Sequence, residues 1–210
     1  MTLSFWLILL AVLAYGLLHS LLASLQAKAK ARHWFGPPTD RWFRVAYNFL
    51  AFITLLPILI LPVLLIDKEI YRIRTPWIIL TALIQVLAVL ALLIGLRQTG
   101  ISSFIGLRQL LLPEDITPSH LVTDGLYRYV RHPLYTAGLV FIWLIPIMSW
   151  NLLALNIGLS VYVFFGAAFE ERKLLREFGE TYAEYRRHTP MLVPGLRFPN
   201  NHSPNIDRHS

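Results

Sequence analysis

The sequence predicts an all-α, polytopic integral membrane protein with five transmembrane helices and a C-terminal amphipathic helix on the cytoplasmic side. Of its 210 residues, 56% are hydrophobic and only 15% are charged, whereas soluble domains carry about 25% charged residues. The apolar residues form long blocks, as they do in membrane proteins. The formal net charge is +7. Because the lysines and arginines lie between the blocks, the positive-inside rule explains them more simply than nucleic-acid binding does, and no nucleic-acid partner is expected.

Five apolar segments are the predicted membrane spans. A spanning helix needs about 20 apolar residues, because each residue rises 1.5 Å and the hydrocarbon core is about 30 Å thick. Pro57 and Pro62 lie within the second segment and predict kinks, since neighbouring helices can satisfy the carbonyl groups that prolines free. The last two segments are so close in sequence that they should form a tight helical hairpin. The five segments are residues 3–25, 43–66, 77–96, 134–148 and 152–169.

The distribution of lysine and arginine predicts the orientation. The first segment has no Lys or Arg before its apolar run, so we interpret it as a retained span and not as a cleaved signal peptide. Sixteen lysines and arginines lie in segments that the five spans would place on one side, namely 28–44, 97–133 and the tail after residue 171. Only three lie on the other side, in connection 67–75. The N-terminus is therefore expected outside and the C-terminus in the cytoplasm, in the inner membrane of a bacterium.

Residues 1–198 are predicted to form one domain, with its N-terminal spans in 3–96 and a second half in 97–198. The string EERKLLREFGETYAEYRR, which begins at Glu170, has the apolar period of an amphipathic helix that lies on the membrane or caps the bundle. The apolar face of this helix comprises Leu174, Leu175, Phe178, Tyr182 and Tyr185. Residues 199–210 are polar and are expected to be disordered.

The densest cluster of polar and aromatic residues is HLVTDGLYRYVRHPLYTAG, at 120–138. Proline is favoured at the first helical position, so Pro133 predicts a helix N-terminus at the cytoplasmic boundary. Such an end carries free N–H groups and partial positive charge, which suits an anion such as a carboxylate. Tyr127 and Tyr135 would supply aromatic surface nearby. The structural alternative is an interfacial belt, in which Arg131 extends toward the headgroups and the tyrosines anchor the helix.

A second cluster, Glu170 and Glu171, lies where the fifth segment ends. Acidic residues at that depth are costly and usually have a partner. Because the fourth and fifth segments form a hairpin, the two glutamates should lie beside Arg131 and His132. A pocket for a zwitterion with a sugar would result, with the carboxylates facing an ammonium or ribose hydroxyls. The structural alternative, an ion pair between Arg131 and one glutamate, remains open.

The C-terminal half resembles the isoprenylcysteine carboxyl methyltransferase family. The matching strings are LVTDGLYRYVRHPLY, FEERKLLREFGETYAEYRR and TPMLVP, which follow one another over about residues 119–194. The resemblance implies S-adenosylmethionine as cofactor. It also implies the residues that contact this cofactor, which are His120, Leu121, Val122, Tyr127, His132, Pro133, Leu134, Tyr135 and Glu170.

The N-terminal half resembles the NnrU-type and methanethiol S-methyltransferase branch, through HSLLAS at 19–24, RWFRVAYNFLAF at 41–52 and FIGLRQ at 104–109, together with IPIMSWNLL at 145–153. One position departs from the eukaryotic prenylcysteine enzymes. These carry an arginine four residues before the first glutamate, and Gly166 stands there in this chain. The departure makes a free carboxylate a poor acceptor.

The leading interpretation is a membrane methyltransferase that uses S-adenosylmethionine and acts on a small or lipophilic acceptor, with a thiol preferred. Its catalytic candidates are Arg131, His132 and Glu171, of which the last two are possible bases. One alternative is a prenylcysteine-type carboxyl O-methyltransferase. Another is a haem-binding protein in which His19 and His132 are the ligands. The partners are the lipid bilayer and the acceptor. The chain has no cysteine, which excludes thiolate metal sites and a cysteine nucleophile, and no metal site is expected.

Overall fold

A computed structural model describes residues 2–100 and 121–196 of the chain. It confirms that the chain is predominantly helical. Four helices in these ranges are long and apolar enough to cross a membrane, namely α1 (Leu3–Leu22), α3 (Thr39–Leu64), α4 (Trp77–Thr99) and α8 (Trp150–Phe178). The expectation of five spans is not confirmed, because α7 (Pro133–Trp143) has only 11 residues. At 1.5 Å per residue it covers about 16 Å, roughly half of the hydrocarbon core.

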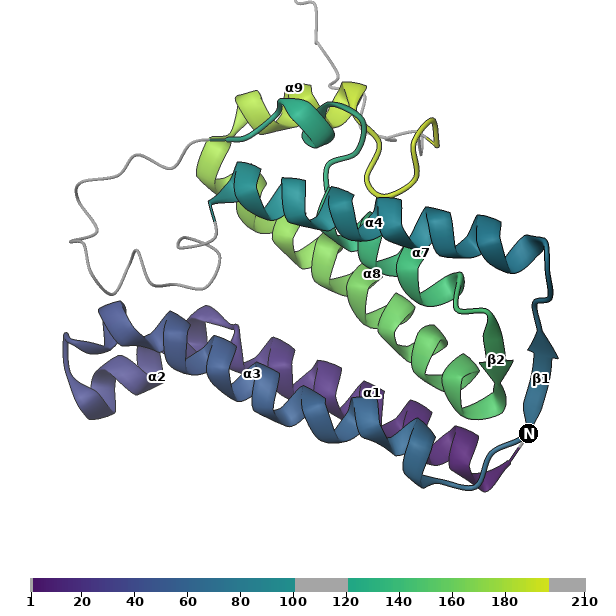
Figure 1. Ribbon diagram of the computed structural model, residues 1–210. Helices are drawn as coiled ribbons and strands as arrows, with labels where there is room; N and C mark the ends of the chain where they lie inside the picture. Colours follow the sequence, from purple (N-terminus) through teal and green to yellow (C-terminus); the bar gives the residue numbers. More distant parts are fainter. Residues whose placement is uncertain (1, 101–120, 197–210) are drawn as a thin grey trace, which may run out of the picture.

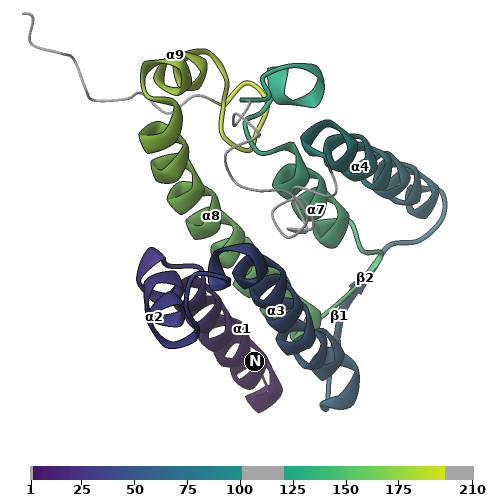
Figure 2. The ribbon, with the colours of Figure 1, turned by 90° about the vertical axis from the view of Figure 1, so that its left-hand side faces the viewer.

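The helices form two groups that meet along α1 and α8 (Figure 1). Helices α1 and α3 form one group with the short helix α2 (Leu25–Phe35), and α4, α7 and α8 form the other. The 3₁₀ helix η2 (Gly125–Arg128) and helix α9 (Glu180–His188) lie at the end of the second group. Figure 2 shows α1 and α3 beside α8 when the bundle is viewed along its length.

Small residues on α8 allow α1 to approach closely. Ala154 is fully buried. Four residues later, a Cβ added to Gly158 would lie only 2.8 Å from Cγ1 of Val12. Pairs of small residues four apart are a common helix contact in membranes, where close van der Waals packing replaces the hydrophobic drive. Around this contact lies a core that includes Phe5, Ile8 and Ile58.

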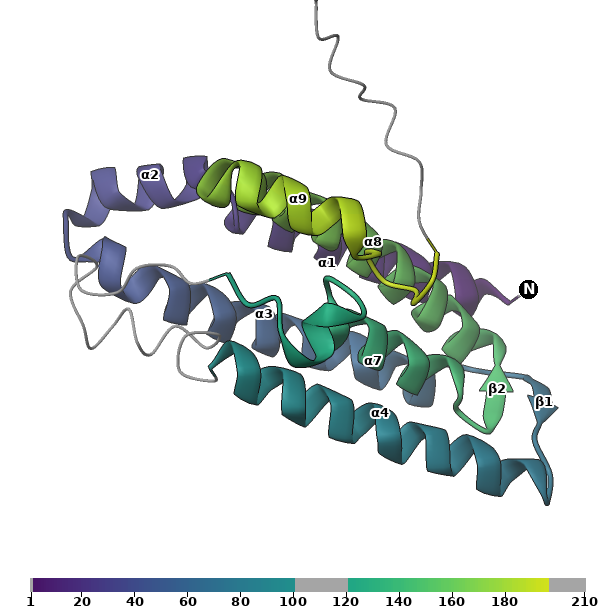
Figure 3. The same cartoon turned by 90° about the horizontal axis from the view of Figure 1, so that it is seen from above.

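A two-stranded sheet joins the connections at one end of the bundle. Strands β1 (Glu69–Arg72) and β2 (Ile147–Ser149) are antiparallel, with Glu69 opposite Ser149 and Arg72 opposite Ile147. The sheet lies near the N-terminus, whereas α2 and α9 lie at the other end (Figures 1 and 3). The basic connections therefore share one end of the bundle and the weakly charged ones share the other, as the charge distribution predicts.

Helix α7 is shorter than the predicted span 134–148 because of Pro146. The backbone of Ile145, which precedes this proline, is disfavoured in the helical region. The last helical hydrogen bond runs from Leu144 N to Val140 O, 3.2 Å. Beyond it, Pro146 O accepts from Ile73 N at 2.8 Å and the chain continues extended into β2. Ser149 then caps α8 by accepting from Leu152 N at 3.2 Å.

The predicted amphipathic helix is divided in two. Its first part, from Glu170 to Phe178, continues α8, which the sequence analysis ended at Phe169. Gly179 follows with φ of +54°, a conformation that glycine adopts at little cost, and it reverses the chain into α9. The apolar residues of both parts then face the same end of α7.

Candidate functional site

A cavity of about 210 Å³ lies where α4, α7, α8 and α9 meet. Its walls combine apolar and aromatic side chains with a few ionisable groups, the usual character of a small-molecule site. The lining residues are Thr99, Leu121, Val122, Tyr127, Arg131, His132, Leu134, Tyr135, Glu170, Leu174, Phe178, Tyr182 and Tyr185.

The N-terminus of α7 forms one wall. Pro133 occupies the first helical turn and His132 is the N-cap, as the sequence predicts. The chain before the helix is fixed by the segment after α9. Arg131 N donates to Pro190 O at 2.9 Å, and His132 N donates to Met191 O at 3.1 Å. The C-terminal string TPMLVP therefore positions the residues at the start of α7.

Arg131 and Glu171 form a buried ion pair. Arg131 Nε lies 2.5 Å from Glu171 Oε1, and the exposed fractions of the two side chains are 9% and 8%. Arg131 also donates to the carbonyl oxygens of Arg186 and Thr189. Its donors are thus directed at α8 and at the end of α9. The ion pair between Arg131 and Glu171 is the structural alternative that the sequence analysis left open. Glu171 does not line the cavity.

His132, Tyr135 and Glu170 form the polar wall. The hydroxyl of Tyr135 donates to Glu170 Oε2 at 2.9 Å, and His132 Nδ1 lies 3.6 Å from the same oxygen. The rings of His132 and Tyr135 are stacked, with centroids 5.4 Å apart. The side chain of Glu170 is 45% exposed. A carboxylate thus stands at the mouth of the cavity, beside a helix end of opposite partial charge.

Two buried polar atoms at the cavity have no hydrogen-bond partner within the described ranges, Nε2 of His132 and the hydroxyl of Tyr182. The imidazole atom lies 3.4 Å from Glu171 Oε1, but not in hydrogen-bonding geometry. Leaving a buried polar atom unpaired typically costs about 1–3 kcal/mol. Both residues line the cavity, and a polar ligand bound there is one source of the missing partners.

Burial keeps the tyrosines of the site protonated. It raises the pKa of Tyr127 to about 12, with a further contribution from the negative charge of Glu170. Burial also raises the pKa of Tyr182, and there Glu171 adds to the effect. The hydroxyl of Tyr185 is hydrogen-bonded to Tyr127 O at 2.5 Å. These side chains therefore act as neutral hydrogen-bonding and stacking groups at physiological pH.

The cavity brings together most of the residues predicted for cofactor contact. Of that set, Leu121, Val122, Tyr127, His132, Leu134, Tyr135 and Glu170 line it. Pro133 is buried and does not line the cavity. His120 lies outside the described residues, as does the segment 199–210. The sequence analysis did not assign Thr99, Leu174, Phe178, Tyr182 or Tyr185 to the site. Helical periodicity placed the last four on one apolar face, but it cannot show what that face covers.

Comparisons with known proteins point to methyl transfer. Residues 77–181 match the family described as phospholipid methyltransferase. Methanethiol S-methyltransferase 1 of Bradyrhizobium diazoefficiens is 37% identical over 87 residues, which are 41% of this chain and 30% of that protein. The methanethiol S-methyltransferase of Crocosphaera subtropica is 38% identical over 92 residues, 42% of this chain and 36% of that protein.

A carboxyl-methylating relative also matches. Protein-S-isoprenylcysteine O-methyltransferase of Schizosaccharomyces pombe is 38% identical over 79 residues, 35% of this chain and 33% of that protein. The matched segment spans about a third of the length of each of these relatives. No solved structure matches the chain.

Proposed function

Because the chain belongs to the phospholipid methyltransferase family, we propose that it is an integral membrane methyltransferase that uses S-adenosylmethionine and acts on a small or lipophilic acceptor, with a thiol preferred. The observation that carries the proposal is the cavity at the start of α7. There a helix N-terminus, the carboxylate of Glu170 and two unpartnered buried polar atoms converge in an apolar, aromatic setting.

The residues of this cavity suit a ligand that is both zwitterionic and aromatic. The helix end favours a carboxylate. Glu170 favours an ammonium group or ribose hydroxyls. The hydroxyl of Tyr182 and Nε2 of His132 offer further polar contacts, and Tyr127 with Leu134 offers surface for a flat base. Once bound, S-adenosylmethionine supplies a methyl group on a sulfonium sulfur.

The protein's own part in the reaction is to orient and to exclude water. Leu174 and Phe178 of α8 line the cavity with apolar surface, and a dry site strengthens every electrostatic contact inside it. Arg131 and Glu171 are positioning residues. Their ion pair, together with the hydrogen bonds from the Arg131 guanidinium to backbone carbonyl groups at the end of α9, fixes α7, α8 and α9 relative to one another. Holding two reactants in line can supply about 7–11 kcal/mol of a barrier.

Two observations favour an uncharged acceptor over a free carboxylate. Among the described residues, a Cβ added to Gly166 would meet nothing within 4 Å, so no described side chain fills the position where the prenylcysteine enzymes carry a cation. The guanidinium of Arg131, which might replace that cation, is already bound to Glu171 and to two carbonyls. An uncompensated carboxylate at membrane depth is costly. The named activity of the methanethiol S-methyltransferase relatives agrees with this preference.

Calorimetry on the detergent-purified chain tests the cofactor. S-adenosylmethionine should bind, and both His132→Ala and Glu170→Gln should weaken it, whereas Glu177→Gln, an exposed acid further along α8, should not. A folded protein that binds no S-adenosylmethionine contradicts the proposal, as does unchanged affinity in both cavity variants.

Acceptor preference is tested by offering ethanethiol and a prenylcysteine acid in one assay with labelled S-adenosylmethionine. The thiol should be methylated faster. Faster methylation of the acid, with a methyl ester as product, would show carboxyl O-methylation instead. A Soret band in the purified protein would support the haem-binding alternative.

A further inference from the structure

A second polar cluster lies among the apolar helices, where α1 and α3 meet α8. We call it the His19 cluster. It comprises His19 and Tyr15 of α1, Tyr47 of α3 and Tyr162 of α8. His19 Nε2 is hydrogen-bonded to the hydroxyl of Tyr47. The imidazole stacks on Tyr15 at 5.6 Å between centroids and meets the edge of Tyr162 at 5.5 Å. Ionisable residues at membrane depth are costly, and they usually mark a function.

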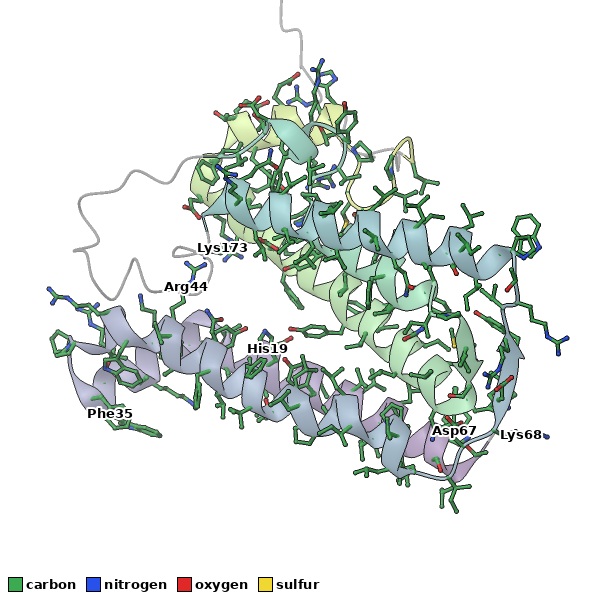
Figure 4. All side chains as sticks on the ribbon, in the orientation of Figure 1. His19, Phe35, Arg44, Asp67, Lys68 and Lys173 are labelled. Carbon is green, nitrogen blue, oxygen red and sulfur yellow. The ribbon has the colours of Figure 1, made fainter. Side chains whose placement is uncertain are left out.

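One nitrogen of His19 is free to act. Within the described ranges, its buried Nδ1 has no hydrogen-bond partner, and the residue lies on the side of α1 that faces α4 and α8 (Figure 4). When Nε2–H donates to the oxygen of Tyr47, Nδ1 carries a lone pair. A histidine that acts as a base usually has this arrangement: one nitrogen is hydrogen-bonded and fixes the ring, and the other accepts the proton.

A glycine on one face of α8 lies between the His19 cluster and the cavity. Tyr162, Gly166 and Glu170 follow one another at four-residue intervals, so they share one face of the helix. Eight residues from Tyr162 to Glu170 correspond to about 12 Å of helix. Between them, a Cβ added to Gly166 would meet no other atom of residues 2–100 and 121–196 within 4 Å.

Tyr135 joins the two regions from the side of α7. Its hydroxyl donates to Glu170 in the cavity. Burial and then Glu170 raise the pKa of Tyr135, and Tyr162 and Tyr47 of the His19 cluster add smaller contributions. Glu170 of the cavity and Tyr162 of the His19 cluster therefore lie on one face of α8, with Gly166 between them.

We propose that the space over Gly166 is the acceptor subsite and that His19 is the general base that takes the proton of a thiol bound there. This inference rests on the proposed methyltransferase function and adds the acceptor subsite and the base to it. The acceptor is a neutral alkyl thiol that enters from the bilayer, since the ring of Tyr162 lies beside His19 and the neighbouring Phe165 and Phe169 of α8 are exposed.

The proposed step balances in atoms and charge. A lone pair of the thiol sulfur forms the new S–C bond to the methyl carbon, and the old C–S bond breaks with its electron pair going to the departing sulfur. The S–H proton passes to Nδ1 of His19. One positive charge thus moves from a sulfonium to an imidazolium, and no net charge is created in the low-dielectric interior. The imidazolium then loses its proton toward water.

His19→Gln tests the base while keeping a group that can bond to Tyr47. With ethanethiol as the probe, we expect kcat to fall by roughly 10²–10⁴-fold, the usual contribution of a general base. Calorimetric affinity for S-adenosylmethionine should stay unchanged. The variant's rate should rise about tenfold per pH unit up to the thiol's own pKa, because only pre-formed thiolate reacts. The other groups that bear on this profile are Tyr15, Tyr47, Tyr162 and Arg44.

Gly166→Leu tests the subsite independently of His19. The leucine side chain should fill the space over Gly166 and raise the KM for ethanethiol at least tenfold. It should also abolish thiol binding measured by saturation-transfer NMR without S-adenosylmethionine. Gly138→Leu is the matched control, since a Cβ at that α7 glycine also meets nothing within 4 Å, and its thiol binding should equal that of the wild type.

The outcomes separate the two proposals. A wild-type chain that binds no S-adenosylmethionine overturns the proposed function. A wild-type chain that binds it and methylates ethanethiol, while His19→Gln keeps the wild-type rate and pH profile, overturns only the role of His19. Equal thiol binding by Gly166→Leu and Gly138→Leu overturns the subsite.

Discussion

The buried ion pair between Arg131 and Glu171 allows one stability prediction to be worked out from the structure. Glu171→Gln removes a charge whose side chain is only 8% exposed. It leaves the Arg131 guanidinium with two carbonyl acceptors and no counter-charge, and it also removes the carboxylate that lies 3.6 Å from Arg186 Nε. Removing one partner of a buried pair typically costs about 3–5 kcal/mol, because the remaining charge stays buried.

This cost should appear as a lower melting temperature in detergent. Since 1 kcal/mol shifts the melting temperature of a chain of this size by roughly 2–4 °C, Glu171→Gln should lower the melting temperature by roughly 6–20 °C. Circular dichroism measures this shift. Glu69→Gln is the control, because the Glu69–Arg72 pair has a similar separation of 2.6 Å but exposed side chains. Its melting temperature should stay close to that of the wild type.

A double variant separates charge from packing. Replacing a buried ion pair by apolar residues is often neutral, so Arg131→Met combined with Glu171→Met should regain part of the loss seen in Glu171→Gln. If Glu171→Gln melted like Glu69→Gln, the pair would not be buried as described, and its role in positioning α7 against α8 would have to be abandoned.

Three further predictions concern topology, packing and pH. A reporter active only in the cytoplasm should give signal when fused to the C-terminus. A signal from a periplasmic reporter instead would contradict the predicted cytoplasmic C-terminus. Gly158→Leu should destabilise the α1–α8 contact by about 1–3 kcal/mol through overpacking against Val12, whereas Gly138→Leu in open space should not. Because burial raises the pKa of Tyr127 from 10.0 to about 12, the folded state holds this proton more tightly than the unfolded state does. The free energy of unfolding should therefore fall as pH rises through that window, and Tyr127→Phe should reduce the fall.

Much of the fold and part of the site could be predicted from local patterns. Long apolar runs predict α1, α3, α4 and α8, because a bilayer demands length and hydropathy that few other structures show. The clustering of basic residues predicts which connections share an end of the bundle. Pro133 predicts the start of α7 because its ring and missing N–H suit the first turn. Hairpin proximity predicts that Arg131 and His132 meet Glu170 and Glu171.

Other features depend on contacts between distant segments. The extended chain after α7 is stabilised by Ile73 and β1, so its length could not be judged from residues 134–148 alone. The role of the C-terminal string follows from hydrogen bonds of Pro190 and Met191 to the chain before α7. The division between α8 and α9 depends on a positive φ at Gly179, which a helical period does not reveal.

The sequence by itself determined that the chain is a helical membrane protein whose motif-bearing ends face one side, because hydropathy, charge and proline act over a few neighbouring residues. The tertiary structure alone decided which side chains became available for chemistry. It occupied Arg131 with Glu171, left Nε2 of His132 and Nδ1 of His19 without partners within the described ranges, and opened the space above Gly166. The physical reason is that an ionisable group is paired or free according to which helices pack beside it.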